Sequence, residues 1–224
     1  MEDIIRLEKV VKMSHDGKRA INGVTMSILD RECVTIISAP GSGKTTLVRL
    51  ISGLDKPSDG QVFVLGNLVN EMRNEEAAIF RNKNIGILHR NPAFLDNLSV
   101  LDNVAMPLII RGDVPFQRRN KVMEQMKTLG LQYTTHARPT QLSPLERHKA
   151  AIARALITEP RILLLDDFAA SLSITDEEEI KATLYAICSY GTYTVVELTG
   201  ADSGLICTDR TVVLDHGKIQ EEQK

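Results

Sequence analysis

The sequence predicts an α/β fold built around a phosphate-binding loop, and three observations support this. A strand-like apolar run, a glycine-containing loop and a helical repeat follow one another between residues 33 and 51. A second apolar run, Ile162 to Leu165, ends in two aspartates. Between these regions, from about residue 91 to 158, apolar residues recur at helical spacing. Strands alternating with helices in this order indicate a sheet covered by helices.

Length and composition are those of one globular domain. The 224 residues, 43% of which are hydrophobic, can bury one substantial core. A net charge of −2 disfavours a nucleic-acid binder. The three cysteines are isolated, so neither a zinc site nor a disulfide framework is expected. No signal peptide and no apolar run of bilayer length is found, so we expect any membrane role to depend on a partner.

The first part of the chain is expected to consist of short strands. Alternating apolar residues predict strands at Ile4 to Val11 and at Val24 to Leu29. The β-branched run Cys33 to Ile37 predicts a third strand, which leads directly into the glycine-containing loop. A helix follows the loop, and after an Asp-Gly turn Gln61 to Leu65 predicts the next strand.

The glycine-containing loop matches the pattern G-x-x-x-x-G-K-[ST] in all but its first position. In such loops, backbone N–H groups and a helix N-terminus hold phosphate oxygens. Lys44 is expected to reach the terminal phosphates, and the Thr45 hydroxyl to bind Mg²⁺. The residues predicted to hold phosphate are Ser38, Ala39, Pro40, Gly41, Ser42, Gly43, Lys44, Thr45 and Thr46.

Ser38 stands in the position of the missing first glycine. It keeps a backbone N–H but carries a Cβ, so a glycine-only φ at this position is expected to cost on the order of 1 kcal/mol. Such a cost weakens the loop without abolishing it. The alternative interpretation of the segment is a glycine-rich turn that merely precedes Lys44 and Thr45.

Strand patterns return after the helical region, which includes the repeat Gln117 to Leu129. Strands are predicted at Ile162 to Leu165, Tyr193 to Leu198 and Thr211 to Leu214. Asp166 then lies at the carboxyl edge of the sheet, where ligands of such folds bind, and is predicted to serve the Mg²⁺ site. A surface Asp-Asp turn is the alternative.

These and other segments occur in the order found in the ATP-binding subunit of ABC transporters, which the chain resembles along nearly its whole length. The segment FLDNLSVLDNVAMPLIIRG is most similar to the branch that contains lipoprotein-releasing and macrolide-export systems. The other matching segments read LEKVVK, INGVTMSI, SAPGSGKTTLVRLISGLDKPSDGQV, RNKNIGIL, QLSPLERHKAAIARALITEPRILLLDD and LDHGKI.

The resemblance implies a P-loop NTPase of the ABC type, with a mixed-sheet core, an N-terminal antiparallel β subdomain and an inserted helical subdomain. The whole chain, 1–224, is then a single ATP-binding domain. Its nucleotide-binding core comprises residues 1–90 and 158–224, and its helical subdomain residues 91–157. The resemblance also implies two such chains facing head to tail, as a homodimer or a heterodimer, each closing ATP against the partner's signature motif.

The catalytic positions of the family pattern are only partly kept. Lys44, Thr45 and Asp166 match it, so the resemblance implies binding of ATP and Mg²⁺. Asp167 replaces the catalytic glutamate, and its carboxylate lies one methylene further from the attacking water. Gly200 replaces the switch histidine and leaves no side chain for the γ-phosphate.

Two further positions leave alternatives open. Arg90 stands where the family has a metal-contacting glutamine, and a guanidinium cannot bind Mg²⁺. It either pairs with the γ-phosphate or turns to solvent or to a carboxylate of a membrane subunit. His15 is the one ring near the family's adenine-stacking position, and it either stacks on adenine or is an ordinary loop histidine.

The signature motif spans Leu142 to Glu146 and has lost both glycines. Ser143 and Glu146 keep an S-x-x-E capping box and Pro144 suits the first helical turn, so the helix start is expected to survive. Ser143 remains a candidate nucleotide contact. The motif's binding function is nevertheless expected to be lost, because Pro144 lacks an N–H, Leu145 adds bulk and Glu146 adds negative charge.

The resemblance implies a peripheral protein at the cytoplasmic face of the cell membrane. We expect an ATP-binding subunit of an ABC transporter that couples ATP binding and dimer closure to movement of permease subunits, with hydrolysis weak or lost. Transmembrane permease subunits are expected to contact the helical subdomain around Pro92 to Leu98. Phe94 and Leu95 are its candidate apolar anchors, and a buried apolar loop is the alternative.

Two other functions are weighed against this one. A non-hydrolysing structural or regulatory subunit of a permease complex is the main alternative, but a pure scaffold has no physical use for Lys44 and Thr45. A soluble ABC protein of DNA repair or translation is disfavoured, because the sequence has no long coiled-coil heptads, no second ATPase domain and no basic surface.

Overall fold

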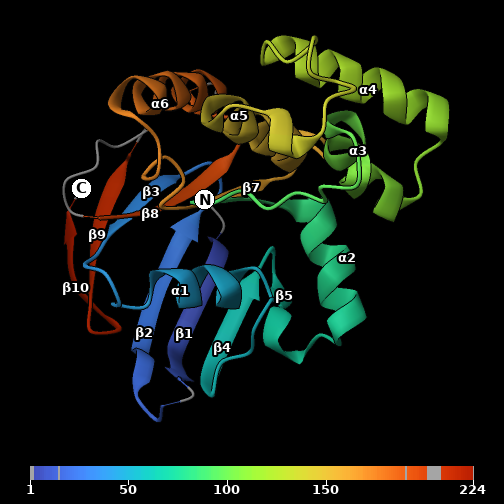
Figure 1. The fold of residues 1–224 in the computed structure, drawn as a ribbon. Helices are drawn as coiled ribbons and strands as arrows, with labels where there is room; N and C mark the ends of the chain where they lie inside the picture. The colour runs from blue at the N-terminus through green and yellow to red at the C-terminus, as the bar shows by residue number, and fades with distance from the viewer. Residues whose placement is uncertain (1–2, 15, 190, 201–207, 224) are drawn as a thin grey trace.

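The computed structural model describes residues 3–14, 16–189, 191–200 and 208–223, and it has the predicted α/β fold. Two sheets lie on either side of helix α1 (Lys44–Ile51), as Figure 1 shows. Further helices cover the other face of the larger sheet. The phosphate loop leads into α1, so it lies where the two sheets meet.

The larger sheet has six strands in the order β10-β9-β3-β8-β7-β6. Neighbouring strands from β9 to β6 are parallel, whereas β10 is antiparallel to β9, so the sheet is mixed. The carboxyl ends of the parallel strands therefore share one edge. The strands are β3 (Cys33–Ile37), β6 (Ile85–His89), β7 (Ile162–Asp166), β8 (Thr194–Thr199), β9 (Arg210–Asp215) and β10 (Lys218–Gln223).

The smaller sheet is the expected N-terminal antiparallel subdomain. Its order is β2-β1-β4-β5, and each neighbouring pair is antiparallel. Side chains of β1, β2 and β4 share one buried cluster with α1 and the larger sheet. The strands are β1 (Asp3–Met13), β2 (Arg19–Leu29), β4 (Asp59–Val64) and β5 (Asn67–Leu68).

The helices over residues 144–156 and 174–188 cover the outer face of the larger sheet, and those over residues 100–111 and 115–128 pack on the first of these, further from the sheet (Figure 1). None of the helices described is both long and apolar enough to cross a membrane. The helices and short 3₁₀ turns are η1 (Val69–Glu71), α2 (Asn74–Asn84), α3 (Val100–Arg111), α4 (Pro115–Thr128), η2 (Pro139–Gln141), α5 (Pro144–Leu156) and α6 (Ile174–Cys188).

Strand β7 is buried on both faces, which explains its uninterrupted aliphatic sequence. Ile162 and Leu164 pack towards α1 and the smaller sheet, whereas Leu163 and Leu165 pack towards the helices on the other face. Each of the four side chains is at most 1% exposed. Full burial of such a side chain contributes about 1.5–3 kcal/mol. The strand therefore supports its last residue, Asp166, rigidly.

Candidate functional site

The phosphate loop wraps around the N-terminus of α1 and is fixed at both ends. The Ser38 N–H donates to the Thr199 carbonyl oxygen at 3.0 Å, which ties the loop to the end of β8. Gly41 and Gly43 have φ of 80° and 108°, in the left-handed region that favours glycine. A Cβ on Gly43 would lie 2.4 Å from the Ala20 carbonyl oxygen. Position 43 therefore requires glycine for two separate reasons.

Ser38 is not strained in the way the sequence predicted. It is not among the described non-glycine residues with positive φ, so the expected backbone penalty is wrong. Its side chain is instead buried, and its Oγ has no hydrogen-bond partner within the described parts of the chain. Leaving a buried hydroxyl unpartnered costs about 1–3 kcal/mol. The replacement of the first glycine is thus costly at the side chain rather than at the backbone.

Lys44 is held inside the loop. Its Nζ donates to the Ser38 carbonyl oxygen at 3.0 Å and lies 3.6 Å from Asp167 Oδ2. Asp167 itself has φ of 48°, and its N–H donates to the Leu198 carbonyl oxygen at 2.9 Å. Left-handed φ in a non-glycine residue costs of the order of 1–3 kcal/mol and is frequent at functional sites. A phosphate in the loop would compete with Asp167 for the Lys44 ammonium.

Thr45 and Asp166 meet at the carboxyl edge of the sheet, as the sequence predicted. Thr45 Oγ1 lies 3.0 Å from Asp166 Oδ2 and donates a hydrogen bond to that carboxylate. A hydroxyl and a carboxylate are oxygen ligands of the kind that Mg²⁺ prefers, so the donor set fits this cation. His89, which the sequence did not indicate, ends β6 and lies opposite Asp166 in the β6–β7 pairing. Its Nδ1 is 3.6 Å from Asp166 Oδ2.

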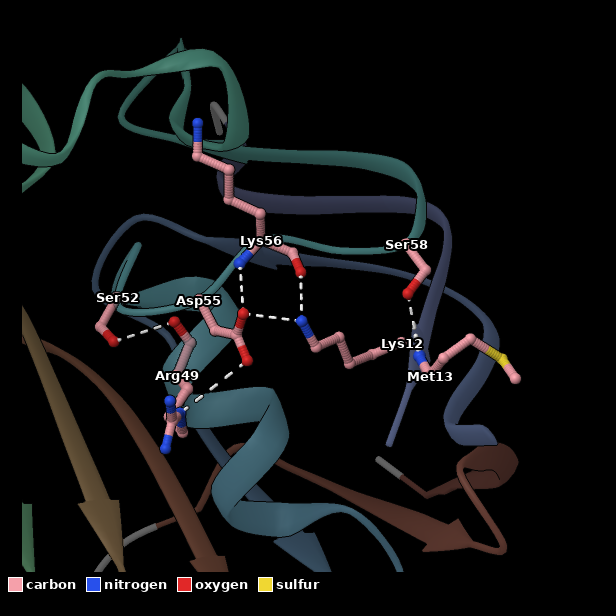
Figure 2. A network of polar contacts seen from close by, with 7 residues as sticks. All are labelled: Lys12, Met13, Arg49, Ser52, Asp55, Lys56 and Ser58. Carbon is pink, nitrogen blue, oxygen red and sulfur yellow. Dashed lines mark hydrogen bonds and ion pairs between the residues drawn. The ribbon is translucent and has the colours of Figure 1, made fainter. Parts of the chain in front are cut away.

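A pocket of about 400 Å³ adjoins the first turns of α1. Figure 2 shows the polar network at its edge, where Lys12 Nζ donates to Asp55 Oδ1 at 2.6 Å and to the Lys56 carbonyl oxygen at 2.7 Å. Burial would raise the pKa of Asp55, but hydrogen bonds from Lys12 and the Lys56 N–H outweigh it and hold the pKa below its ordinary value. The pocket is lined by Lys12, Met13, Ser14, Ala20, Thr45, Thr46, Arg49 and Asp55.

The pocket lies where the sequence placed the adenine contact. Met13 and Ser14 line it, and the Met13 N–H donates to Ser58 Oγ at 3.0 Å. The candidate stacking residue, His15, lies outside the described residues. Thr46, predicted as a phosphate contact, is also part of the pocket wall.

Arg90 and Gly200 follow the ends of β6 and β8, at the same edge as Asp166. The Arg90 side chain is exposed and forms no ion pair within the described part of the molecule. Its carbonyl oxygen accepts a hydrogen bond from Ser171 Oγ at 3.0 Å. The guanidinium is therefore open to solvent in the absence of a bound anion.

Ser143 caps helix α5, and the predicted capping box is present. The Glu146 N–H donates to Ser143 Oγ at 3.2 Å, and the Ser143 N–H donates to Glu146 Oε2 at 2.8 Å. Both side chains are thus engaged with the backbone of their own helix. None of the contacts seen among the described residues joins Ser143 to the phosphate loop of the same chain.

The segment after β6 is anchored on α5 through Phe94. The guanidinium carbons of Arg147 and Arg154 lie 5.2 Å and 4.6 Å from the centre of the Phe94 ring, and the ring packs against the buried cluster of the outer helices. Leu95, in contrast, is 50% exposed. Phe94 therefore holds the loop in place, while Leu95 is presented to solvent.

A groove of about 290 Å³, which the sequence did not indicate, lies between α2, β6, α3 and α5. Burial lowers the pKa of Arg81 and of Arg154, and both guanidiniums donate to backbone carbonyl oxygens. Ile110 lies in the wall and is 63% exposed. The groove is lined by Ala78, Arg81, Asn82, Ile85, Gly86, Ile87, Pro107, Ile110, Arg154, Ala155 and Thr158.

A loop of this geometry between a buried strand and a helix defines the class of P-loop nucleotide-binding domains. The sequence pattern of the family described as "ABC transporter" matches residues 21–170. The chain therefore belongs to the ABC transporter family, and its fold is that of the family's ATP-binding domain.

Relatives match the chain over nearly its full length. The "Lipoprotein-releasing system ATP-binding protein LolD" of Chromohalobacter salexigens is 32% identical over 225 residues, covering 99% of this chain and 94% of that protein. The protein of the same name from Bacteroides thetaiotaomicron is 32% identical over 219 residues, covering 98% and 100%. A solved dimeric structure of the ATP-binding cassette MJ0796, in a post-hydrolysis state with ADP and Pi, is 30% identical and has a TM-score of 0.88 over 98% of both chains.

Proposed function

We propose that this chain is the ATP-binding subunit of a membrane ABC transporter of the lipoprotein-releasing kind, peripheral at the cytoplasmic face. It binds ATP with Mg²⁺, closes against a second ATP-binding subunit and couples that closure to movement of permease subunits. Its own hydrolysis of ATP is weak or lost. The names of the relatives support the class of complex, and the geometry of the site supports the division between binding and hydrolysis.

The observation that carries the binding proposal is the meeting of Thr45 and Asp166 at 3.0 Å beside Lys44. Thr45 and Lys44 begin α1, and Asp166 ends β7, so the two halves of the site come from segments far apart in the sequence. A scaffold without nucleotide gains nothing from holding a buried lysine, a hydroxyl and a carboxylate at one sheet edge. ATP with a divalent cation satisfies all three groups.

Weak hydrolysis is supported by two positions. The carboxylate of Asp167, the candidate general base, lies 3.6 Å from Lys44 Nζ. Lys44 must leave this contact before it can bind phosphate. Gly200 offers no side chain to the γ-phosphate. Loss of a general base lowers rates by about 10²- to 10⁴-fold, and such losses are not additive when groups act together. We therefore propose slow cleavage rather than a specific rate.

We propose that this chain pairs with a second ATP-binding subunit, and that its signature motif makes an altered contact with the ATP of that subunit. Ser143 and Glu146 already satisfy each other's backbone groups, and Pro144 has no N–H to offer a partner's phosphate. An ATP held by the partner chain would consequently meet few donors on this surface. We propose that this surface therefore contributes less to closure around the partner's ATP than an intact signature motif would.

The permease is proposed to dock at the border of the helical subdomain (residues 91–157), along the groove that its helices α3 and α5 form with α2. The permease contact was expected at the segment Pro92 to Leu98, and this segment borders the groove. Arg154 lines the groove and also donates a hydrogen bond to the Ala93 carbonyl oxygen of the segment at 2.7 Å. Ile110 in the groove and Leu95 in the segment Pro92 to Leu98 are exposed and supply apolar surface for docking. Phe94 is a poor anchor for a partner because its ring is already packed.

Replacement of Ile110 by glutamate tests the docking surface. A carboxylate in the apolar wall should release the chain from its permease subunits while leaving ATP binding unchanged, because Ile110 lies on α3, away from the phosphate loop. Co-purification from detergent extracts measures the association. Ile174→Glu, the same change at a 78% exposed position on α6, is the control. Retention of Ile110→Glu at the level of this control would contradict the proposed groove.

Equilibrium binding of labelled ATP with Mg²⁺ tests the nucleotide site. We expect Lys44→Ala to weaken binding by at least about tenfold, because it removes a charge-assisted contact to phosphate worth about 1.5–3 kcal/mol.

A scaffold that binds no nucleotide is the second candidate function. The observation that favours it is the contact between Lys44 and Asp167, because this contact gives the Lys44 ammonium a partner within the chain. Equal and negligible binding by the wild type and Lys44→Ala would establish the scaffold.

A further inference from the structure

We propose that His89 supplies an imidazole nitrogen to the divalent cation that accompanies the nucleotide, so that this site prefers Mn²⁺ or Co²⁺ to Mg²⁺. The inference rests on the proposed nucleotide site at Thr45 and Asp166. It adds a nitrogen donor that neither the sequence motifs nor the named relatives assign.

The placement of His89 follows from the sheet. Strands β6 and β7 are parallel neighbours, and His89 pairs with Asp166 at their carboxyl ends. Its Nδ1 lies 3.6 Å from Asp166 Oδ2, the same oxygen that accepts from Thr45 Oγ1 at 3.0 Å. Side chains from α1 and β6 therefore converge on the carboxylate that ends β7.

The distances suit a shared cation. Two ligands bound at about 2.1 Å and at right angles to one another lie about 3 Å apart. The Nδ1–Oδ2 distance of 3.6 Å is slightly longer than this. The His89 side chain is 46% exposed, so its ring can turn towards the carboxylate without disturbing the core.

The donor set is incomplete without a nucleotide. Among the described residues, no group of three or more His, Cys, Asp and Glu side chains could hold a metal ion alone. Thr45, Asp166 and His89 supply one hydroxyl, one carboxylate and one imidazole, and phosphate oxygens would complete the set. Arg90, which follows His89, offers no ligand because a guanidinium carries no acceptor.

The chemistry of the donors predicts the metal preference. Hydroxyl, carboxylate and phosphate oxygens suit both Mg²⁺ and Mn²⁺, but Mn²⁺ and Co²⁺, as first-row transition metals, accept an imidazole nitrogen more readily than Mg²⁺ does. One nitrogen among oxygens should therefore favour Mn²⁺ and Co²⁺ over Mg²⁺ in nucleotide binding. Because a purely structural histidine would not change this preference, the ratio of affinities reports on His89 directly.

Pulsed electron paramagnetic resonance of the bound Mn²⁺ tests the proposal. The full chain, free of any histidine tag, is loaded with Mn²⁺ and a non-hydrolysable ATP analogue, with ¹⁵N-labelled protein to distinguish protein nitrogen from adenine nitrogen. We expect a protein-nitrogen coupling in the wild type that His89→Phe abolishes. His136→Phe changes an exposed histidine of the helical region and should retain the coupling.

The metal selectivity supplies a second readout. The ratio of nucleotide affinities in Mn²⁺ and in Mg²⁺ should fall by about tenfold in His89→Phe and stay unchanged in His136→Phe. Lys44-dependent nucleotide binding with no protein-nitrogen coupling, or with the same ratio in His89→Phe, would overturn this inference and leave the proposed function standing. Absence of Lys44-dependent nucleotide binding in either metal would overturn both.

Discussion

At the scale of the residue, the phosphate loop depends on glycine at position 43 more than at position 38. Gly43 combines a φ of 108° with a close backbone approach, because a Cβ at this position would lie 2.4 Å from the Ala20 carbonyl oxygen. Ser38 has neither feature, and only its buried hydroxyl lacks a partner among the described residues. Loss of the first glycine in the pattern is therefore compatible with an intact loop.

Replacing Gly43 by alanine is expected to lower the free energy of unfolding by about 2–4 kcal/mol, because it adds a backbone clash to the cost of left-handed φ. Gly41→Ala is the matched control. Its φ is also left-handed, at 80°, but nothing lies within 4 Å of its Cβ position, so the expected loss is about 1–2 kcal/mol. Urea unfolding measures both, and equal losses would contradict the role given to the Ala20 contact.

The residues of the site were predictable where a motif fixes them. Lys44, Thr45 and Asp166 lie together as the motif and the aliphatic strand indicated. His89 was not predictable in the same way, because no motif names it and its partner lies far along the chain on a different strand. Only the pairing of β6 with β7 brings it to Asp166.

At the scale of the element, the sequence predicted the strands that are buried on both faces and missed those with weak patterns. The runs at β3 and β7 consist almost entirely of aliphatic or β-branched residues and were found within one residue of their bounds. Strand β6 was missed because it is short and contains Gly86, which weakens a strand pattern. A Cβ on Gly86 would lie 2.8 Å from the Ala155 carbonyl oxygen, so glycine permits close approach of α5 to the sheet.

The contact between β1 and the segment after α1 gives a pH-dependent prediction. Asp55 has a pKa held below its ordinary value, so its contribution to stability is full above the unfolded-state pKa of about 3.9 and is lost as pH falls through the folded-state pKa. Lys12→Ala removes the main hydrogen bond responsible. It should lower the free energy of unfolding by about 0.5–1 kcal/mol at neutral pH.

That difference should shrink as pH falls from about 4 through the lower pKa that Asp55 has in the folded wild-type chain, because protonation removes the carboxylate that Lys12 contacts. Urea unfolding at pH 7, 5 and 3 measures it. Lys18→Ala, at an exposed ion pair with Asp16, serves as a control with little expected effect. A Lys12→Ala deficit that stays constant from pH 7 to pH 3 would show that packing, and not the ion pair, is responsible.

At the scale of the whole molecule, two buried clusters share the larger sheet. One joins its inner face to α1 and the smaller sheet, and the other joins its outer face to α3, α4, α5 and α6. The proposed helical subdomain therefore shares its core with the nucleotide-binding sheet. Strand β6 carries His89 at its carboxyl end and lines the groove between α2, α3 and α5 with residues from its other end.

The overall architecture was predictable from the order of segments, because the resemblance runs along nearly the whole chain and a relative matches 99% of it. The groove was not, since it is built from α2, β6, α3 and α5, which come from separate stretches of the sequence and carry no shared motif. Depth and exposure of such a surface are properties of packing between elements. They become visible only when the chain is folded.

A single-turnover assay with labelled ATP and a divalent cation, on the purified chain alone and with its membrane partner, tests the central claim most directly. Bound and cleaved nucleotide are followed separately, with Lys44→Ala as the control. We expect Lys44-dependent binding with cleavage that is slow or undetectable over the time in which the nucleotide stays bound. Rapid Lys44-dependent cleavage by the chain alone would contradict it and would show that Asp167 acts as an effective base despite its contact with Lys44.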